Sequence, residues 1–284
     1  GDEAIGLGEK ALSEFQSLFE KSPAILPQAL EKVALMANEL GILYSRRNDP
    51  VTARRHIQVG LRSLEQAQEM GVELPPHLVS LRARLFQQNA ICFEQENNYA
   101  KAKENAVAGW RIAKGAAEQS ANIEINDLYR HLTKLCWTLT TAEGNNRESL
   151  GFCDDFLATG GIEDKEFAIR RRKIISHVLL GDRPIAQQEI VNLTKRENAP
   201  APVSHLKSAT KHLRMVITNV KRRQNQDHQR QRLAGWCQYL VEQLNKGGHL
   251  DDGLRKELLE TSEFEVFRQQ PELSEFMASL GKTS

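Results

Sequence analysis

Hydrophobic residues recur at three- and four-residue intervals along most of the chain, which predicts amphipathic α-helices. The pattern is clearest over residues 34–65, where two helical stripes flank the polar turn Asn48-Asp49-Pro50. Runs of alternating β-branched residues never outlast a few positions, so no strand is predicted. The chain is therefore expected to be all-α.

The helical stripes fall into about five pairs. The first, second, third and fifth pairs span residues 27–70, 77–118, 123–158 and 203–245, and the fourth turns at Gly181-Asp182-Arg183-Pro184. A single helix over residues 2–20 precedes them, and a helical tail over 250–280 follows, with Phe264, Phe267, Leu273 and Phe276 as its expected packing residues. We divide the chain into an N-terminal capping helix (1–26), four repeats (27–199), and a fifth pair with its cap (200–284), as one continuous array.

The first two pairs repeat each other at an offset of 49 positions. Four packing positions then coincide, namely Gly41 with Ala90, Tyr44 with Phe93, Ala53 with Ala102 and Gly60 with Gly109. Small residues at such positions allow two helices to cross closely, and a constant offset indicates an internal repeat. In the third pair Trp137 falls near the small position, so a wider crossing or a shifted register is expected there.

Local turn chemistry supports the pairing. Asp49 is placed to cap the second helix of the first pair, and Pro50 fits the first turn, where no amide donor is needed. Asp182 and Pro184 are expected to repeat this device in the fourth pair.

Small residues facing each other across a helix pair, with an aromatic residue between them, resemble the tetratricopeptide repeat (TPR) family. The tail is similar to the segment that follows the last repeat in many bacterial members. The resemblance implies an α-α superhelix, a TPR-like solenoid of about five helix pairs with an N-terminal helix and a C-terminal helical cap. In this family the first helix of each pair, the A helix, lines a concave face that holds an extended peptide or a partner's helix.

Carried over residue by residue, the resemblance predicts a partner-binding groove. Its expected residues are Asn38, Ile42, Ser45, Arg84, Gln87, Ile91, Glu94, Lys134 and Arg171. Ile42 and Ile91 stand where the asparagines of the family's carboxylate clamp are expected, so binding of a chaperone C-terminus is disfavoured.

Charge is unevenly distributed in a chain whose net charge is only +1. Residues 165–232 hold sixteen Lys or Arg against five Asp or Glu, a net charge of +11. Such a segment suits an anionic partner, or else it covers solvated helix faces, and we favour the second interpretation. Few aromatic residues accompany the basic clusters, although base stacking on nucleic acid would use them.

Candidate chemistry is sparse. The sequence has no GxxxxGK[ST], GxGxxG, HExxH or GxSxG motif, so no enzyme activity and no cofactor are expected. Cys92, Cys136, Cys153 and Cys237 lie in helical patterns without metal-site spacing and are interpreted as small buried hydrophobic residues in a reducing compartment. His205 and His212 share a helical face but lack the acidic or thiolate ligands of a metal site.

Three functions are compatible with these observations. The first is a non-enzymatic scaffold whose partly apolar, partly basic groove binds an acidic or amphipathic protein or peptide. The alternatives are nucleic-acid or polyanion binding through residues 165–232, and a regulatory or sensory module of a larger protein such as a kinase. No bilayer-spanning run is found and a cytoplasmic location is expected, although Gly1 looks like a tag-cleavage remnant, which leaves room for a removed leader or further domain.

Overall fold

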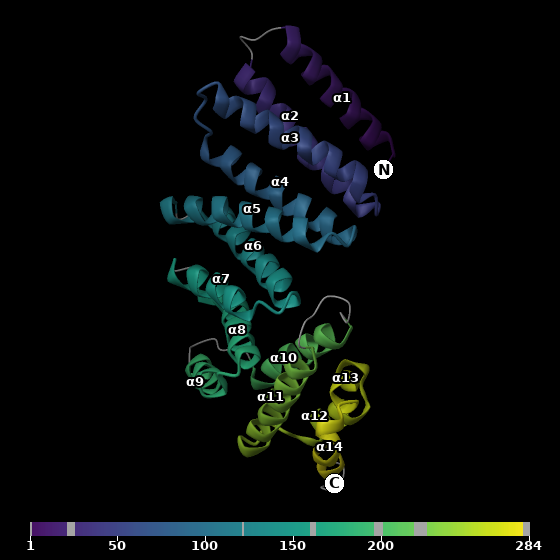
Figure 1. Ribbon diagram of the computed structural model, residues 1–284, viewed down its shortest axis with the longest axis vertical. Helices are drawn as coiled ribbons and strands as arrows, with labels where there is room; N and C mark the ends of the chain where they lie inside the picture. Colours follow the sequence, from purple (N-terminus) through teal and green to yellow (C-terminus); the bar gives the residue numbers. More distant parts are fainter. Residues whose placement is uncertain are drawn as a thin grey trace. The chain divides into compact units, whose positions relative to one another are not determined.

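The chain is all-α in the computed structural model, which describes residues 2–21, 26–120, 122–159, 163–195, 201–218 and 226–280. These residues form fourteen α-helices and two short 3-10 helices (Figure 1). The chain divides into two compact units, Gly1–Leu139 (unit 1) and Thr140–Ser284 (unit 2). The expected domain boundary at residue 199, in the sequence NAPAP, lies outside the described residues.

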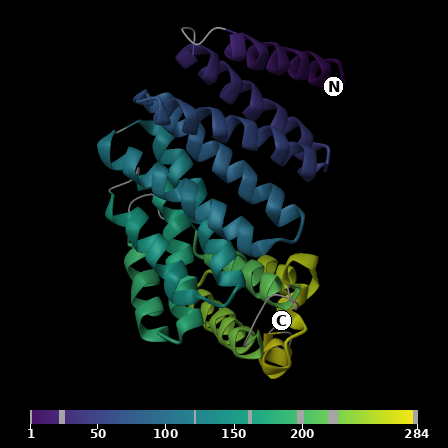
Figure 2. The same cartoon turned by 45° about the horizontal axis from the view of Figure 1, so that its top comes forward.

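In unit 1, each helix packs mainly on its neighbours in the sequence. The helices are α1 (Asp2–Lys21), α2 (Leu26–Arg46), α3 (Pro50–Glu69), α4 (Pro76–Gln95), α5 (Tyr99–Gln119) and most of α6 (Ile123–Ala142). Contacts join α1 to α2, α2 to α3, α3 to α4 and α4 to α5 (Figure 2). The A helices α2 and α4 also contact each other directly, so they lie side by side.

Unit 2 contains the remaining pairs and the tail. Its helices are α7 (Asn146–Ala158), α8 (Glu163–Leu180), α9 (Arg183–Thr194), α10 (Pro202–Thr218), α11 (Gln226–Lys246), α12 (Asp252–Glu260), η3 (Ser262–Phe264), α13 (Glu265–Arg268), η4 (Pro271–Leu273) and α14 (Ser274–Leu280). Here α7 packs on α8, α8 on α9 and α10 on α11, while α8 also contacts α10 and α11. Sequential packing in both units is consistent with a helical repeat arrangement.

Four of the hairpins close with the same turn. A residue one or two positions after the A helix has a positive φ, as seen at Asn48 (60°), Asn97 (60°), Gly144 (82°) and Gly181 (92°). The next amide then bonds the carbonyl oxygen five residues back: Asp49 to Tyr44 (3.0 Å), Asn98 to Phe93 (2.8 Å), Asn145 to Thr140 (3.0 Å) and Asp182 to His177 (2.8 Å). This bonding satisfies carbonyls at the helix end, and glycine or asparagine tolerates the left-handed backbone that it requires.

The predicted cap at Asp49 is confirmed, because its Oδ1 accepts a hydrogen bond from the Thr52 amide at 3.1 Å. The prediction that Asp182 repeats this cap was wrong. Asp182 occupies the N-cap position of α9, but its side chain accepts no bond from the helix. Its carboxylate is turned toward His177 instead, with Oδ2 lying 3.7 Å from Nδ1.

The helices of the first pair cross closely, as the small residues predict. A Cβ atom at Gly41 would lie 2.6 Å from Ile57 Cγ1, and one at Gly60 would lie 3.1 Å from Ala37 Cβ. Tyr44 joins this crossing to α1, since its ring stacks on His56 with centroids 5.3 Å apart and its hydroxyl donates to Glu9 Oε1 at 2.6 Å. The close crossing of the two helices and an aromatic residue packed beside it therefore occur together in the first pair.

The tail packs on the fifth helix pair. Phe264, Phe267 and Leu273 are fully buried as predicted, whereas Phe276 is only half-buried and the neighbouring Met277 is buried. Contacts run from η3 and α13 to α10, and from η4 to α11. The tail thus covers apolar surface of that pair.

We predict that Gly41→Ala destabilises unit 1 by about 1–3 kcal/mol, because the added methyl group overlaps Ile57 at the crossing. Gly115→Ala is the matched control, since a Cβ atom there meets no atom within 4 Å. That control should gain up to about 1 kcal/mol from helix propensity. Urea denaturation followed by circular dichroism measures both, and equal effects of the two substitutions would contradict the close crossing.

Candidate functional site

A hollow of about 400 Å³ lies in unit 1 along the A helices α2, α4 and α6. We call it the A-helix groove. It is lined by Asn38, Glu39, Ile42, Arg84, Gln87, Gln88, Glu124, Asp127, Leu128 and His131. The lining is mainly polar, with Ile42 and Leu128 as its aliphatic residues.

The groove reflects the sequence repeat. Asn38 and Glu39 of α2 correspond, at the offset of 49 positions, to Gln87 and Gln88 of α4. Because α2 and α4 lie side by side, equivalent positions of the two repeats line one hollow. A ligand that crosses both helices would therefore meet two amide side chains in similar settings.

The structure brings together four of the nine predicted groove residues, namely Asn38, Ile42, Arg84 and Gln87. The half-buried Ser45, Ile91 and Glu94 lie on the same helices but outside this lining, as does Lys134 on α6. Ser45 Oγ instead donates to Gln95 Oε1 at 3.4 Å. Arg171 belongs to α8 in unit 2 and lines a different hollow.

The sequence predicted that α6 contributes through Lys134 and missed the residues of α6 that line the groove. Glu124, Asp127, Leu128 and His131 are spaced as one helical face, and this face lines the groove. Their spacing could have revealed the stripe, but Trp137 left the register of the third pair open. Trp137 is fully buried in the structure.

Asn38 is the most enclosed polar residue of the groove, with 6% of its surface exposed. Its Nδ2 lies 3.4 Å from Glu39 Oε1, and its buried Oδ1 has no hydrogen-bond partner. A buried acceptor without a donor is energetically unfavourable by about 1–3 kcal/mol. An incoming N–H group at this oxygen would remove that penalty.

The groove contains more acidic than basic groups. Arg84 lies 3.8 Å from Glu124 in an exposed ion pair, which contributes little to stability. Asp127 pairs at 3.3 Å with Arg130, and Glu39 adds a third carboxylate. Burial, and then the nearby Arg130, lower the pKa of His131, which disfavours a positive charge there. The groove therefore has a net acidic lining, whereas the sequence predicted a partly basic one.

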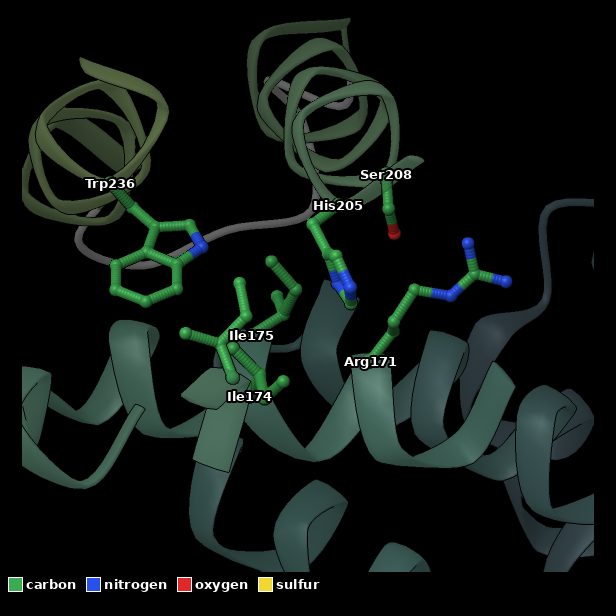
Figure 3. A pocket seen from close by; sticks show the side chains of 7 residues that line it. Arg171, Ile174, Ile175, His205, Ser208 and Trp236 are labelled. Carbon is green, nitrogen blue, oxygen red and sulfur yellow. The ribbon is translucent and has the colours of Figure 1, made fainter. Parts of the chain in front are cut away.

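A second, water-sized hollow of about 10 Å³ lies in unit 2 among α8, α9, α10 and α11 (Figure 3). Its lining consists of Arg171, Ile174, Ile175, Ile190, His205, Ser208 and Trp236. His205 is 5% exposed, and its buried Nε2 has no hydrogen-bond partner. Burial, with a smaller effect from Arg171, lowers the pKa of His205 to about 4, so the ring is neutral at pH 7.

Many cations of the basic segment take part in packing contacts. Lys207 lies within 3.5 Å of both Glu257 and Glu263, and Arg214 donates to the carbonyl oxygens of Ser262 and Glu263 at 2.7 and 2.9 Å. These bonds attach the tail to α10. The cluster Lys221-Arg222-Arg223 lies outside the described residues.

The four cysteines are buried and free, as the sequence predicts. Burial raises the pKa of Cys92 to about 11 and that of Cys237 to about 12, so these thiols remain protonated. The described residues contain no group of three His, Cys, Asp or Glu side chains suited to a metal ion. Nor does any helix within the described ranges combine the length and the apolar run needed to cross a membrane.

Comparison with known proteins finds no matching family model, no matching curated protein and no matching solved structure. A functional interpretation of the chain therefore depends on the geometry and charge of the two hollows.

We predict that acidification destabilises the fold through His205. The unfolded chain binds a proton at this group near pH 6.5, whereas the folded pKa is about 4, so the unfolded state gains protons first as the pH falls. Between pH 7 and pH 4 this group alone should lower the free energy of unfolding by about 3 kcal/mol. Urea titrations of the wild type and His205→Gln at both pH values measure the difference, and an equal pH dependence of the two proteins would contradict the prediction.

Proposed function

We propose that the chain is a non-enzymatic, TPR-like interaction scaffold whose A-helix groove holds an extended peptide or a helix of a partner protein. The proposal takes the sequential helix pairs as repeats of a solenoid that the tail caps. Its main support is that equivalent positions of α2 and α4 line one hollow together with a face of α6.

The polar groups of the groove suit a polypeptide ligand. A peptide backbone presents N–H donors and C=O acceptors at regular intervals, and the side-chain amides of Gln87 and Gln88 can bond either kind. The Oδ1 atom of Asn38 adds an acceptor that has no hydrogen-bond donor within the part of the chain that the structure describes. An N–H group of the partner would satisfy it once the Asn38 side chain turns toward the groove, because the oxygen is buried in the unbound chain.

The charge of the groove favours an amphipathic partner over a strongly acidic one. Three carboxylates, those of Glu39, Glu124 and Asp127, line the groove with one arginine, Arg84, although Asp127 also pairs with Arg130 outside the lining. Like charges brought together at an interface cost binding energy. Ile42 and Leu128 offer aliphatic contacts, so a segment with apolar and either neutral or basic side chains is the preferred ligand.

Nucleic-acid or polyanion binding is the alternative, favoured by the +11 charge of residues 165–232. Against it, Lys207 and Arg214 hold the tail, and Arg230 donates to the buried Gln270 at 3.0 Å. Moving these cations onto phosphates would require breaking packing contacts. Protein binding is therefore the preferred proposal.

We predict that the triple variant Asn38→Ala, Arg84→Ala, Gln87→Ala loses peptide capture without losing its fold. Peptides selected on the wild type from a random displayed library should bind this variant at least about tenfold more weakly, because each good interface hydrogen bond contributes on the order of 1 kcal/mol. Stability should change little, since Asn38 Oδ1 and Gln87 have no hydrogen bond to lose in the described structure.

The matched control removes one arginine and two glutamines from exposed positions of α3, as Gln58→Ala, Arg62→Ala, Gln66→Ala. It should bind the selected peptides like the wild type. Unaltered capture by the groove variant, or equal losses in both triple variants, would refute the assignment of the groove.

A salt titration with RNA separates the protein-binding proposal from the polyanion-binding alternative. We expect generic RNA to bind weakly even at low ionic strength. Tight binding whose logarithm falls steeply with the logarithm of the salt concentration would instead identify a polyanion binder. Fluorescence anisotropy with a labelled single strand provides this measurement.

A further inference from the structure

Arg171 differs from its neighbours in the basic run of α8. Arg170 pairs with Glu166 at 2.8 Å, and Lys173 contacts Asp154 at 3.0 Å. Around Arg171, the described structure contains no carboxylate within ion-pair distance, and burial alone lowers its pKa. A guanidinium nevertheless keeps its charge, so a half-buried cation without an anionic partner remains at this place.

Two polar residues of α10 line the hollow together with Arg171. Figure 3 shows Ser208 and His205 extending from α10 toward the side of α8 that carries Arg171, whose guanidinium extends away from the His205 ring. The Nε2 of His205 is buried without a hydrogen-bond partner. On the other side of His205, Ile174 and Ile175 of α8 and Trp236 of α11 form the apolar part of the lining.

We propose that Arg171, Ser208 and His205 form a binding site for a single carboxylate group. The guanidinium supplies the positive charge and N–H donors, the hydroxyl supplies an O–H donor, and the neutral imidazole can carry its proton on Nε2 and donate it. Charge-assisted bonds of this kind are short and strong. The ligand would satisfy both the uncompensated cation and the unpaired ring nitrogen.

Charge selects a carboxylate over a phosphate. The hollow of about 10 Å³ is at the lower limit for a single oxygen atom, so the remaining atoms of either anion would lie outside it. Because His205 is neutral, the site offers one positive charge, which matches a monoanion. A phosphate dianion would keep one charge uncompensated.

The site lies entirely in unit 2, whereas the A-helix groove lies in unit 1. Its existence therefore does not depend on peptide capture by the groove. Either proposal can fail while the other holds.

The test is a ¹H–¹⁵N NMR titration of the full chain with sodium acetate, at an ionic strength held constant with sodium chloride. We expect saturable shifts of the Arg171 side-chain signal and the His205 ring signals. Ser208→Ala should weaken acetate binding about tenfold, since it removes one hydrogen bond to a charged group. Arg171→Gln should abolish the shift of the His205 ring.

Lys211→Gln is the charge-matched control, because Lys211 is exposed on α10 and does not line the hollow. It should bind acetate like the wild type. Absence of saturation, equal weakening by Lys211→Gln, or tighter binding of inorganic phosphate would overturn the proposal. A capped pentapeptide with one glutamate identifies the source: tighter binding than acetate indicates a protein-borne carboxylate, and weaker binding indicates a small free acid.

Discussion

The arrangement of unit 1 depends on the close approach of helix backbones at small residues. Gly41 lies against Ile57 so closely that even a methyl group would overlap it, and Gly60 is similarly confined by Ala37 and Leu85. Close-packed interiors tolerate little change in volume at such points. Because the second pair repeats these small positions 49 residues later, α2 and α4 present equivalent faces to one hollow.

The four hairpin turns share one backbone geometry, although the residues that adopt it differ. Asn48 and Asn97 adopt the left-handed conformation in the first two pairs, and Gly144 and Gly181 adopt it in the next two. Both residue types accept this conformation at low cost, so a common bonding pattern survives a change of side chain. In unit 2, cations such as Arg214 add long-range bonds that attach the tail.

The sequence was sufficient to predict helix existence, helix bounds and the Asp49 cap, because these follow from hydrophobic periodicity and local bonding. It was insufficient wherever a distant side chain decides the outcome. Asp182 does not cap α9, and its carboxylate lies toward His177, a residue of the preceding helix. The groove residues of α6 were not predicted because its register was left open by Trp137. The grouping of Arg171 with Ser208 and His205 depends on how α8 and α10 pack, which the sequence pattern does not give. Predicted roles for the groove residues remain predictions.

The central claim is that the faces of α2, α4 and α6 that line the groove bind a polypeptide. Hydrogen–deuterium exchange of the full chain, with and without a saturating selected peptide, tests it most directly, since bound ligand slows local opening where it contacts the fold. The account predicts slower amide exchange in α2, α4 and α6, with little change in α3 and α5. Protection confined to α3 and α5, or to unit 2, would contradict it.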